Sequence, residues 1–116
     1  MHELGVVFNI VKQVDEIAEK NNVASVASLT IEVGEVSAII PELFEDCFEW
    51  AKKKSKYLQD CKLNLVVIEA ITYCEDCKKT YSTVKYGKTC PYCKSPHTYL
   101  VTGNELIMKK IDVNDK

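Results

Sequence analysis

Four cysteines in two short pairs are the residues whose types and spacing point most directly to chemistry. Cys74 and Cys77 form one Cys-x-x-Cys pair, and Cys90 and Cys93 form another after twelve intervening residues. This spacing lets four thiolates meet one tetrahedral Zn(II), on turns whose backbone amides point at the sulfurs. We therefore expect a structural zinc ribbon, with a pair of disulfides as the alternative. Four sulfur ligands leave no open position for substrate or water, so this metal would serve folding.

A second metal site is expected at the N-terminus. His2 directly follows Met1, which should be retained because the second residue is not small. The α-amine, the His2 backbone nitrogen and the His2 imidazole can close two fused chelate rings on one ion, and the Glu3 backbone nitrogen or a carboxylate can complete a plane. Planar, nitrogen-rich donors favour Ni(II) or Cu(II) over Zn(II). From this pattern alone an incidental His2 stays open as the alternative, and His97 is interpreted as an exposed loop residue.

The two remaining cysteines carry weaker signals. Cys47 lies on an apolar helical stripe and is interpreted as a core residue. Cys61 begins a strand, a position compatible with exposure, but no base in the sequence is visibly paired with it. Neither cysteine is therefore expected to be a catalytic thiol.

Composition narrows the classes of partner. The chain has 116 residues, a formal net charge of −2, and fifteen basic residues that are all lysine. Without arginine it has no bidentate group for phosphates or guanine edges, which argues against nucleic acid. Lysines alternate with tyrosines in the ribbon, but a zinc tetrathiolate would nearly neutralise their field. No export signal or long apolar run is visible, so we expect a reducing, cytoplasmic location and no membrane contact.

Two segments are expected to be helices. Over residues 4–20 apolar side chains recur at steps of three and four, and charged residues take the other face. Pro41 opens a second helix, as proline does at a first helical position, and Lys52 to Lys54 fall in its last turn. The apolar members are Leu4, Val7, Val11, Val14 and Ala18 in the first helix, and Leu43, Phe44, Cys47, Phe48 and Ala51 in the second.

Three further segments are expected to be strands. Residues 28–35 alternate between apolar and polar side chains, residues 62–72 form a strand that runs into the ribbon, and residues 105–112 form a third strand. Inside the ribbon, four strand-forming side chains are expected to lie in short hairpins, while the last four residues are expected to fray. The strand formers are Tyr73, Tyr81, Val84 and Tyr86.

The order of these elements predicts an α+β fold, with two helices on a three-stranded sheet and an inserted zinc-ribbon module. The first expected domain comprises residues 1–72 and is completed by residues 101–116. The second is the zinc-binding ribbon of residues 73–100.

Several motifs occur together in a characteristic order. They are Met1-His2-Glu3-Leu4, Ile31-Glu32-Val33-Gly34-Glu35, Pro41-Glu42-Leu43-Phe44, the two Cys-x-x-Cys pairs and Gly103-Asn104-Glu105-Leu106. In this order and at this length they resemble the hydrogenase-maturation nickel metallochaperones of the HypA/HybF family. The resemblance covers essentially the whole chain.

The resemblance implies a cytoplasmic protein that is not an enzyme. It implies transport of Ni(II) to the large subunit of [NiFe] hydrogenase, together with a GTPase hydrogenase-maturation factor and, in some organisms, a urease accessory protein. Carried over by position, His2 and Glu3 are the nickel residues, with the Met1 amine as a further donor, and the four paired cysteines are the Zn(II) ligands. Ile40 replaces an acidic residue that lies close to the nickel in some members, which leaves the fourth nickel donor open, with Glu42 as the nearest carboxylate.

Two other functions are alternatives to this one. A zinc-ribbon adaptor would bind protein or nucleic acid and would have no nickel role. A thiol–disulfide oxidoreductase is disfavoured, because the two cysteine pairs together fit one metal better than either pair fits redox cycling.

Overall fold

The first compact unit is built on two amphipathic helices. The computed structural model describes residues 3–116, and this unit comprises residues up to 31, 39–66 and 107–116. Helix α1 spans Glu3–Lys20 and helix α2 spans Pro41–Lys52, with proline in the first turn of α2 as the sequence predicts. The predicted stripes are largely buried, with Val7, Val14, Phe44 and Phe48 fully shielded from solvent. Spacing of three and four therefore sets the inner faces of both helices.

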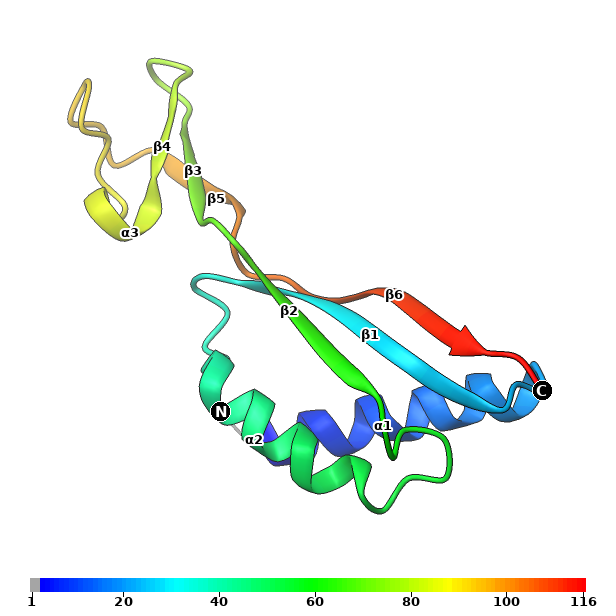
Figure 1. Ribbon diagram of the computed structural model, residues 1–116. Helices are drawn as coiled ribbons and strands as arrows, with labels where there is room; N and C mark the ends of the chain where they lie inside the picture. The colour runs from blue at the N-terminus through cyan, green and yellow to red at the C-terminus, as the bar shows by residue number, and fades with distance from the viewer. Residues whose placement is uncertain (1–2) are drawn as a thin grey trace. The chain divides into compact units, whose positions relative to one another are not determined.

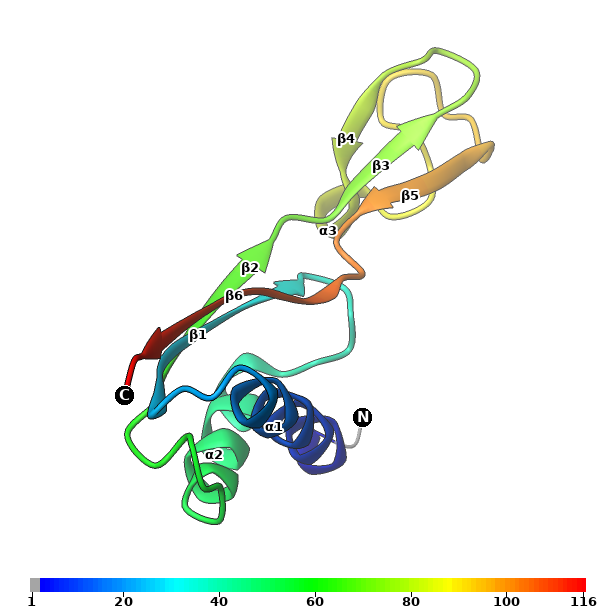
Figure 2. The same cartoon turned by 90° about the vertical axis from the view of Figure 1, so that its right-hand side faces the viewer.

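A sheet lies against the two helices. Its order is β2-β1-β6, where β1 is Ser25–Gly34, β2 is Lys62–Ile68 and β6 is Leu106–Asn114. The central strand β1 contributes buried side chains that include Leu29, Ile31 and Val33. Figures 1 and 2 show α1 and α2 side by side on one face of this sheet. The predicted α+β class, with two helices on a three-stranded sheet, is confirmed.

Hydrogen bonds join the loop between α2 and β2 to α1, and no local sequence pattern predicts them. The Ser55 hydroxyl donates to the Asp15 carboxylate at 2.6 Å, and the Tyr57 hydroxyl donates to Glu19. Ser55 Oγ also accepts from the backbone N–H groups of Tyr57 and Leu58 at 3.2 and 3.1 Å. One buried hydroxyl thus satisfies three polar groups in the unit.

The second compact unit comprises residues 32–38 and 67–106. Its sheet has the order β4-β3-β5, where β3 is Ile71–Cys74, β4 is Thr80–Ser82 and β5 is Thr98–Thr102, and a short helix α3 spans Thr83–Tyr86. Both strand pairs are antiparallel. This unit is larger than the expected ribbon domain because it includes the end of β1, the loop that follows it and the residues at both ends of the ribbon. The assignment of nickel and zinc to separate domains stays a prediction.

Close backbone contacts hold the segment of residues 32–38, the end of β1 and the loop after it, within the second unit. A Cβ added at Gly34 would lie 2.1 Å from the carbonyl carbon and oxygen of Gly103. One added at Gly103, whose φ is +112°, would lie 2.4 Å from the Cα of Ala70. The Glu35 carboxylate accepts from the Ala70 backbone N–H at 2.9 Å, and the Val36 N–H donates to the Gly103 carbonyl at 2.8 Å. Only glycine at both positions allows this approach.

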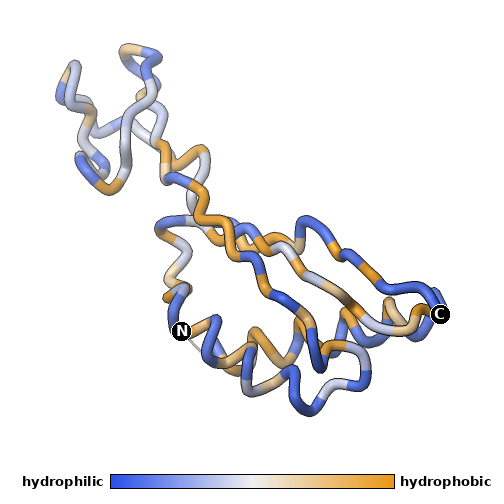
Figure 3. The backbone as a smooth tube through the Cα atoms, in the orientation of Figure 1, coloured by the Kyte–Doolittle hydropathy of each residue, from blue (hydrophilic) through white to orange (hydrophobic). Residues whose placement is uncertain are grey.

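Three predicted element limits are wrong. The expected strand over residues 62–72 is two strands, β2 and β3. Figure 3 shows hydrophobic residues where β2 ends, so hydropathy does not mark the break between the two strands. Val84 and Tyr86 lie in the short helix α3 and not in a strand. Strand β6 continues to Asn114, so part of the segment expected to fray is paired in the sheet.

Candidate metal centre

Each cysteine pair of the predicted zinc site lies in the same kind of turn. The backbone N–H of Lys78 donates to the Cys74 carbonyl and that of Lys94 donates to the Cys90 carbonyl, both at 2.9 Å. Lys78 and Lys94 take equivalent left-handed conformations, with φ of +59° and +63°. The Tyr92 N–H also points at the Cys90 sulfur, at 3.4 Å. Both cysteine pairs therefore lie in the same turn, with one residue in the left-handed region, and this turn places their sulfurs for metal binding.

Short strands bring the two turns together. Cys74 ends β3, whose register pairs Tyr73 with Thr80 on one side and Cys74 with Thr98 on the other. Cys74, Tyr81 and Cys90 form a small buried cluster against which Cys77 packs. With so few apolar side chains, this cluster alone is a small core, and a bound metal would add the missing stabilisation.

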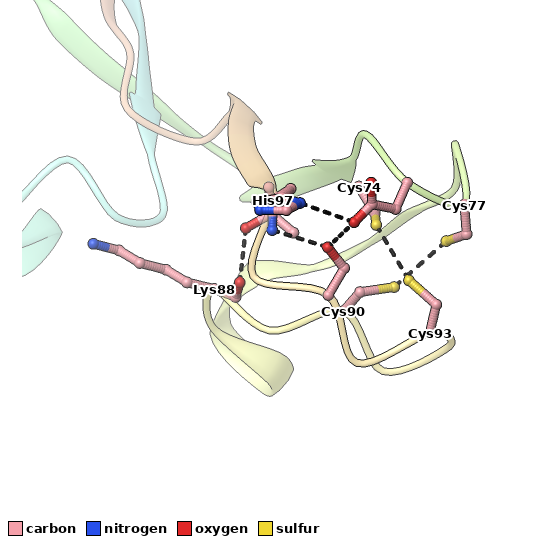
Figure 4. A network of polar contacts seen from close by, with 9 residues as sticks. Cys74, Cys77, Lys88, Cys90, Cys93 and His97 are labelled. Carbon is pink, nitrogen blue, oxygen red and sulfur yellow. Dashed lines mark hydrogen bonds and ion pairs between the residues drawn. The ribbon is translucent and has the colours of Figure 1, made fainter.

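The four sulfurs have the geometry of a tetrahedral site. Cys74 and Cys93 Sγ are 3.5 Å apart, Cys77 and Cys90 Sγ are 3.6 Å apart, and all four sulfurs lie within 4.8 Å of one another. A tetrahedron with metal–sulfur bonds of about 2.3 Å has edges of about 3.8 Å, whereas a disulfide needs about 2.05 Å. Figure 4 shows the sulfurs converging from the two turns. The residues therefore fit Zn(II), and all four cysteines are free thiols.

Hydrogen bonds and burial move the pKa values of two clustered thiols, Cys90 and Cys93, in opposite directions. Burial raises the pKa of the Cys90 thiol, but the backbone N–H groups of Cys93 and Tyr92 outweigh this effect and lower it to about 7. The Ser95 backbone N–H lowers the pKa of Cys93, yet burial and hydrogen bonds with the neighbouring cysteines raise it to about 12. Cys90 thus deprotonates before Cys93, and a metal must displace the proton of Cys93 when it binds.

A polar network outside the sulfurs joins the two turns. Asp76, between the first two cysteines, accepts from the Ser95 hydroxyl and lies 3.0 Å from His97 Nδ1. These hydrogen bonds, from Ser95 first and His97 second, lower the pKa of the Asp76 carboxyl. His97 is exposed and is not one of the four clustered ligand residues. The sequence does not reveal this network, because its members lie about twenty positions apart.

The predicted nickel residues fall at the edge of the structure. Met1 and His2 lie outside the described residues. Glu3 begins α1, is 3% exposed, and accepts a hydrogen bond through its carboxylate from the Ile40 backbone N–H at 3.3 Å. The structure thus brings Glu3 to the start of α2, beside the position where Ile40 was noted in the sequence. The side chains of Ile40 and Glu42 are exposed.

The two single cysteines do not form a site with the other four. Cys61, whose position in the sequence is compatible with exposure, is buried, with 1% of its surface accessible, and burial raises the pKa of its thiol to about 11. Cys47 is half-buried on α2. A protonated buried thiol is a poor nucleophile, so the structure adds no support for thiol chemistry at Cys61.

Comparison with known proteins gives one consistent result. The family model "Hydrogenase/urease nickel incorporation, metallochaperone, hypA" matches residues 1–113. A protein of Actinobacillus succinogenes named hydrogenase maturation factor HypA is 31% identical over 113 residues, which cover 97% of this chain and 99% of the relative. One of Trichormus variabilis with the same name is 34% identical over 115 residues, covering 99% and 97%.

Two solved structures are similar to this chain over nearly its whole length. The solution structure of the Ni metallochaperone HypA from Helicobacter pylori is 26% identical, has a TM-score of 0.71 and covers 100% of both chains. A second solution structure, titled HypA protein, is 28% identical with a TM-score of 0.73 and covers 97% of this chain and 96% of its own.

Proposed function

Because this chain belongs to the HypA family of nickel-incorporation metallochaperones, we propose that it carries Ni(II) at its own N-terminus and delivers it during maturation of [NiFe] hydrogenase. It is a maturation factor and not an enzyme, and its four-cysteine site has the ligands to bind a metal. We propose that this second site holds Zn(II) with a structural role. Nickel is then the cargo and zinc the resident ion.

One observation carries the separation of the two metals. The four-sulfur cluster is complete as a tetrahedral site, so an ion held there has no free coordination position through which to be handed on. A cargo ion needs an open site whose ligands can be exchanged one after another. The Met1 amine together with the nitrogens of His2 offers such a site, with the square-planar donors that suit Ni(II).

The environment of Glu3 refines its role. Its carboxylate is buried and already bound to the Ile40 N–H, so we expect Glu3 to serve nickel through its backbone nitrogen. The carboxylate would instead fix the first turn of α1 against the start of α2. This hydrogen bond would fix the position of Glu3, the residue that directly follows the proposed chelating residues Met1 and His2.

We propose partners that follow from the same role. They are a GTPase hydrogenase-maturation factor, the large subunit of [NiFe] hydrogenase and, where the organism has urease, a urease accessory protein. The free thiols of the four-cysteine cluster need a reducing compartment, which supports the cytoplasm. No helix in residues 3–116 is long and apolar enough to cross a membrane.

Calorimetric titration with nickel tests the proposal. Zinc-loaded protein with a native N-terminus should bind one equivalent of Ni(II), and His2→Ala should lower the affinity by at least about 100-fold, because it removes the imidazole and with it one of the two fused chelate rings. His97→Ala is the matched control, because it removes the other histidine of the sequence and should leave nickel affinity within about threefold. Glu3→Gln should also keep most of the affinity if the backbone nitrogen is the donor.

An extension ahead of Met1 should act like His2→Ala, because it converts the amine into an amide. Zinc content should stay at one equivalent in every variant, measured by elemental analysis. Unchanged nickel binding in His2→Ala, with loss in His97→Ala, would place nickel in the ribbon and would favour the adaptor function for this fold.

A further inference from the structure

The second cysteine pair, Cys90 and Cys93, depends on a few hydrogen bonds for its position relative to the first pair, Cys74 and Cys77. Cys74 is the last residue of β3, so the first pair continues directly from a sheet. Residues 87–97, which contain the second pair and are all described by the structure, include no helix or strand. Hydrogen bonds outside the regular elements must therefore fix how the second pair is oriented toward the first.

Asp76 and Ser95 form a side-chain hydrogen bond that links the two pairs. Asp76 lies between the cysteines of the first pair and accepts from the hydroxyl of Ser95, two positions after Cys93. Ser95 is only 8% exposed, and its carbonyl accepts from the Cys90 N–H at 3.0 Å, so it belongs to the turn of the second pair. A hydrogen bond to an ionised carboxylate is stronger than one between neutral groups. This bond therefore joins the two turns directly.

Neighbouring contacts restrict the same motion. The Glu75 N–H donates to the His97 carbonyl at 3.0 Å, and the Ser95 hydroxyl oxygen accepts from the His97 N–H at 3.0 Å. His97 Nδ1 lies 3.0 Å from the Asp76 carboxylate (Figure 4). The Asp76–Ser95 bond joins two side chains, so substitutions can remove it without changing the backbone.

The orientation of the two pairs decides which metal the four sulfurs accept. In a tetrahedral site the line between one pair of sulfurs is perpendicular to the line between the other pair, whereas in a square-planar site both lines share one plane. Zn(II) has a filled d shell and accepts the tetrahedron, but Ni(II), with eight d electrons, gains from a square plane. Because selectivity among such ions comes from geometry and ligand type, a link that stops the second pair from rotating disfavours Ni(II).

We propose that Asp76 and Ser95 determine the metal specificity of the four-cysteine site. Their hydrogen bond keeps the two cysteine pairs in the orientation that Zn(II) accepts, and so keeps Ni(II) out. This inference rests on the proposed function in one respect, because a nickel carrier exposes its zinc site to the cargo ion. Neither residue binds the metal, and both act through the position of the second pair.

Metal exchange measures this specificity. Zinc-loaded protein carrying His2→Ala, which removes the proposed N-terminal nickel site, is equilibrated without oxygen in chelator buffers that fix the free Ni(II) and Zn(II) concentrations. Thiolate-to-nickel charge-transfer absorption reports the nickel that is bound to cysteine. The measured quantity is the ratio of free Ni(II) to free Zn(II) at which half of the four-cysteine sites hold nickel. Because the N-terminal site is absent, failure of the nickel-carrier proposal would leave this result unaltered.

Substitutions separate the hydrogen bond from the charge of the carboxylate. Asp76→Ala and Ser95→Ala should each lower the ratio at least about tenfold, and the double variant should match the larger single effect, because both changes remove one bond. Glu75→Ala is the matched control, since it removes the neighbouring carboxylate, and it should leave the ratio within about threefold. Asp76→Asn should also stay within about threefold, because its amide oxygen can still accept from Ser95.

Nuclear magnetic resonance gives an independent reading of the geometry. Ni(II) is paramagnetic in a tetrahedral site and diamagnetic in a square plane, so nickel-loaded protein with both residues intact should show strongly shifted cysteine β-proton resonances that Asp76→Ala loses. Unchanged ratios in both alanine variants, additive effects in the double variant, or an Asp76→Asn shift as large as that of Asp76→Ala would overturn the proposal, as would unshifted resonances in the intact site. If Asp76→Ala held neither metal, Ser95→Ala would decide, because it removes only one hydroxyl.

Discussion

Replacing Gly34 by alanine should be among the most damaging single-methyl changes in this chain. The added Cβ would lie 2.1 Å from the Gly103 carbonyl group, where ordinary contact begins at 3.4 Å. The backbone must therefore separate by about 1.3 Å. Both neighbours are main-chain atoms, so no side chain can rotate away to make room.

The magnitude follows from what that separation breaks. The Gly34 N–H donates to the Glu105 carbonyl and the Val36 N–H to the Gly103 carbonyl, both at 2.8 Å. Two hydrogen bonds at about 0.5–1.5 kcal/mol each, added to about 1–3 kcal/mol of overpacking, give a loss of about 2–6 kcal/mol in the free energy of unfolding. A domain of this size has about 5–15 kcal/mol in total, so the loss should be plainly measurable.

Urea denaturation of the zinc-loaded protein, followed by circular dichroism, measures the free energy directly. Hydrogen exchange at the Val36 amide should accelerate by at least about 30-fold, the factor that corresponds to about 2 kcal/mol. Gly5→Ala is the matched control, because its added methyl meets nothing, and it should leave stability unchanged or raise it by up to about 1 kcal/mol. The close approach of Gly34 to Gly103 would be refuted if both variants were equally stable and Val36 kept its protection.

Three further predictions concern other parts of the molecule. Ser55→Ala should cost about 2–4 kcal/mol in urea denaturation, because two buried backbone N–H groups lose their acceptor; a loss below about 0.5 kcal/mol would mean that water replaces the hydroxyl. Lys94→Gly should slow zinc release to a chelator, since glycine adopts the positive φ without strain, and faster release would contradict this. Zinc affinity in chelator competition should fall as pH falls, by at least about tenfold per pH unit above 7, because the pKa of Cys93 is raised to about 12 and its proton must leave when the metal binds; the raised pKa of Cys77 acts in the same direction. The fall should become steeper below about pH 7, where Cys90 is protonated as well, and a pH-independent affinity would contradict thiolate ligation.

The parts that the sequence predicts well are those set by neighbouring residues. The buried faces of α1 and α2 follow from steps of three and four, and Pro41 marks the start of α2 because its ring suits a first helical turn. The four-cysteine cluster follows from ligand spacing, since each Cys-x-x-Cys turn is a local structure that needs no distant partner.

The misplaced limits depend on contacts between distant residues. The apolar run of β2 continues through Ala70 without any turn signal, so the pattern cannot show where the strand ends. The break occurs where the Ala70 N–H bonds to the Glu35 carboxylate, 35 positions away, and where its Cα meets Gly103. Burial of Cys61 is likewise a property of the folded unit and not of the segment around it.

The glycines of this chain differ in what the surrounding structure requires of them. Gly34 and Gly103 are required by atoms of this chain, because any Cβ would collide with backbone, and Gly103 also has a positive φ. Among the described residues, none lies within 4 Å of a Cβ added at Gly5, although glycine weakens the helix that carries it. The same replacement of glycine by alanine is therefore expected to have opposite effects on stability at the two positions: a collision with backbone lowers it at Gly34, whereas the better helix propensity of alanine preserves or raises it at Gly5.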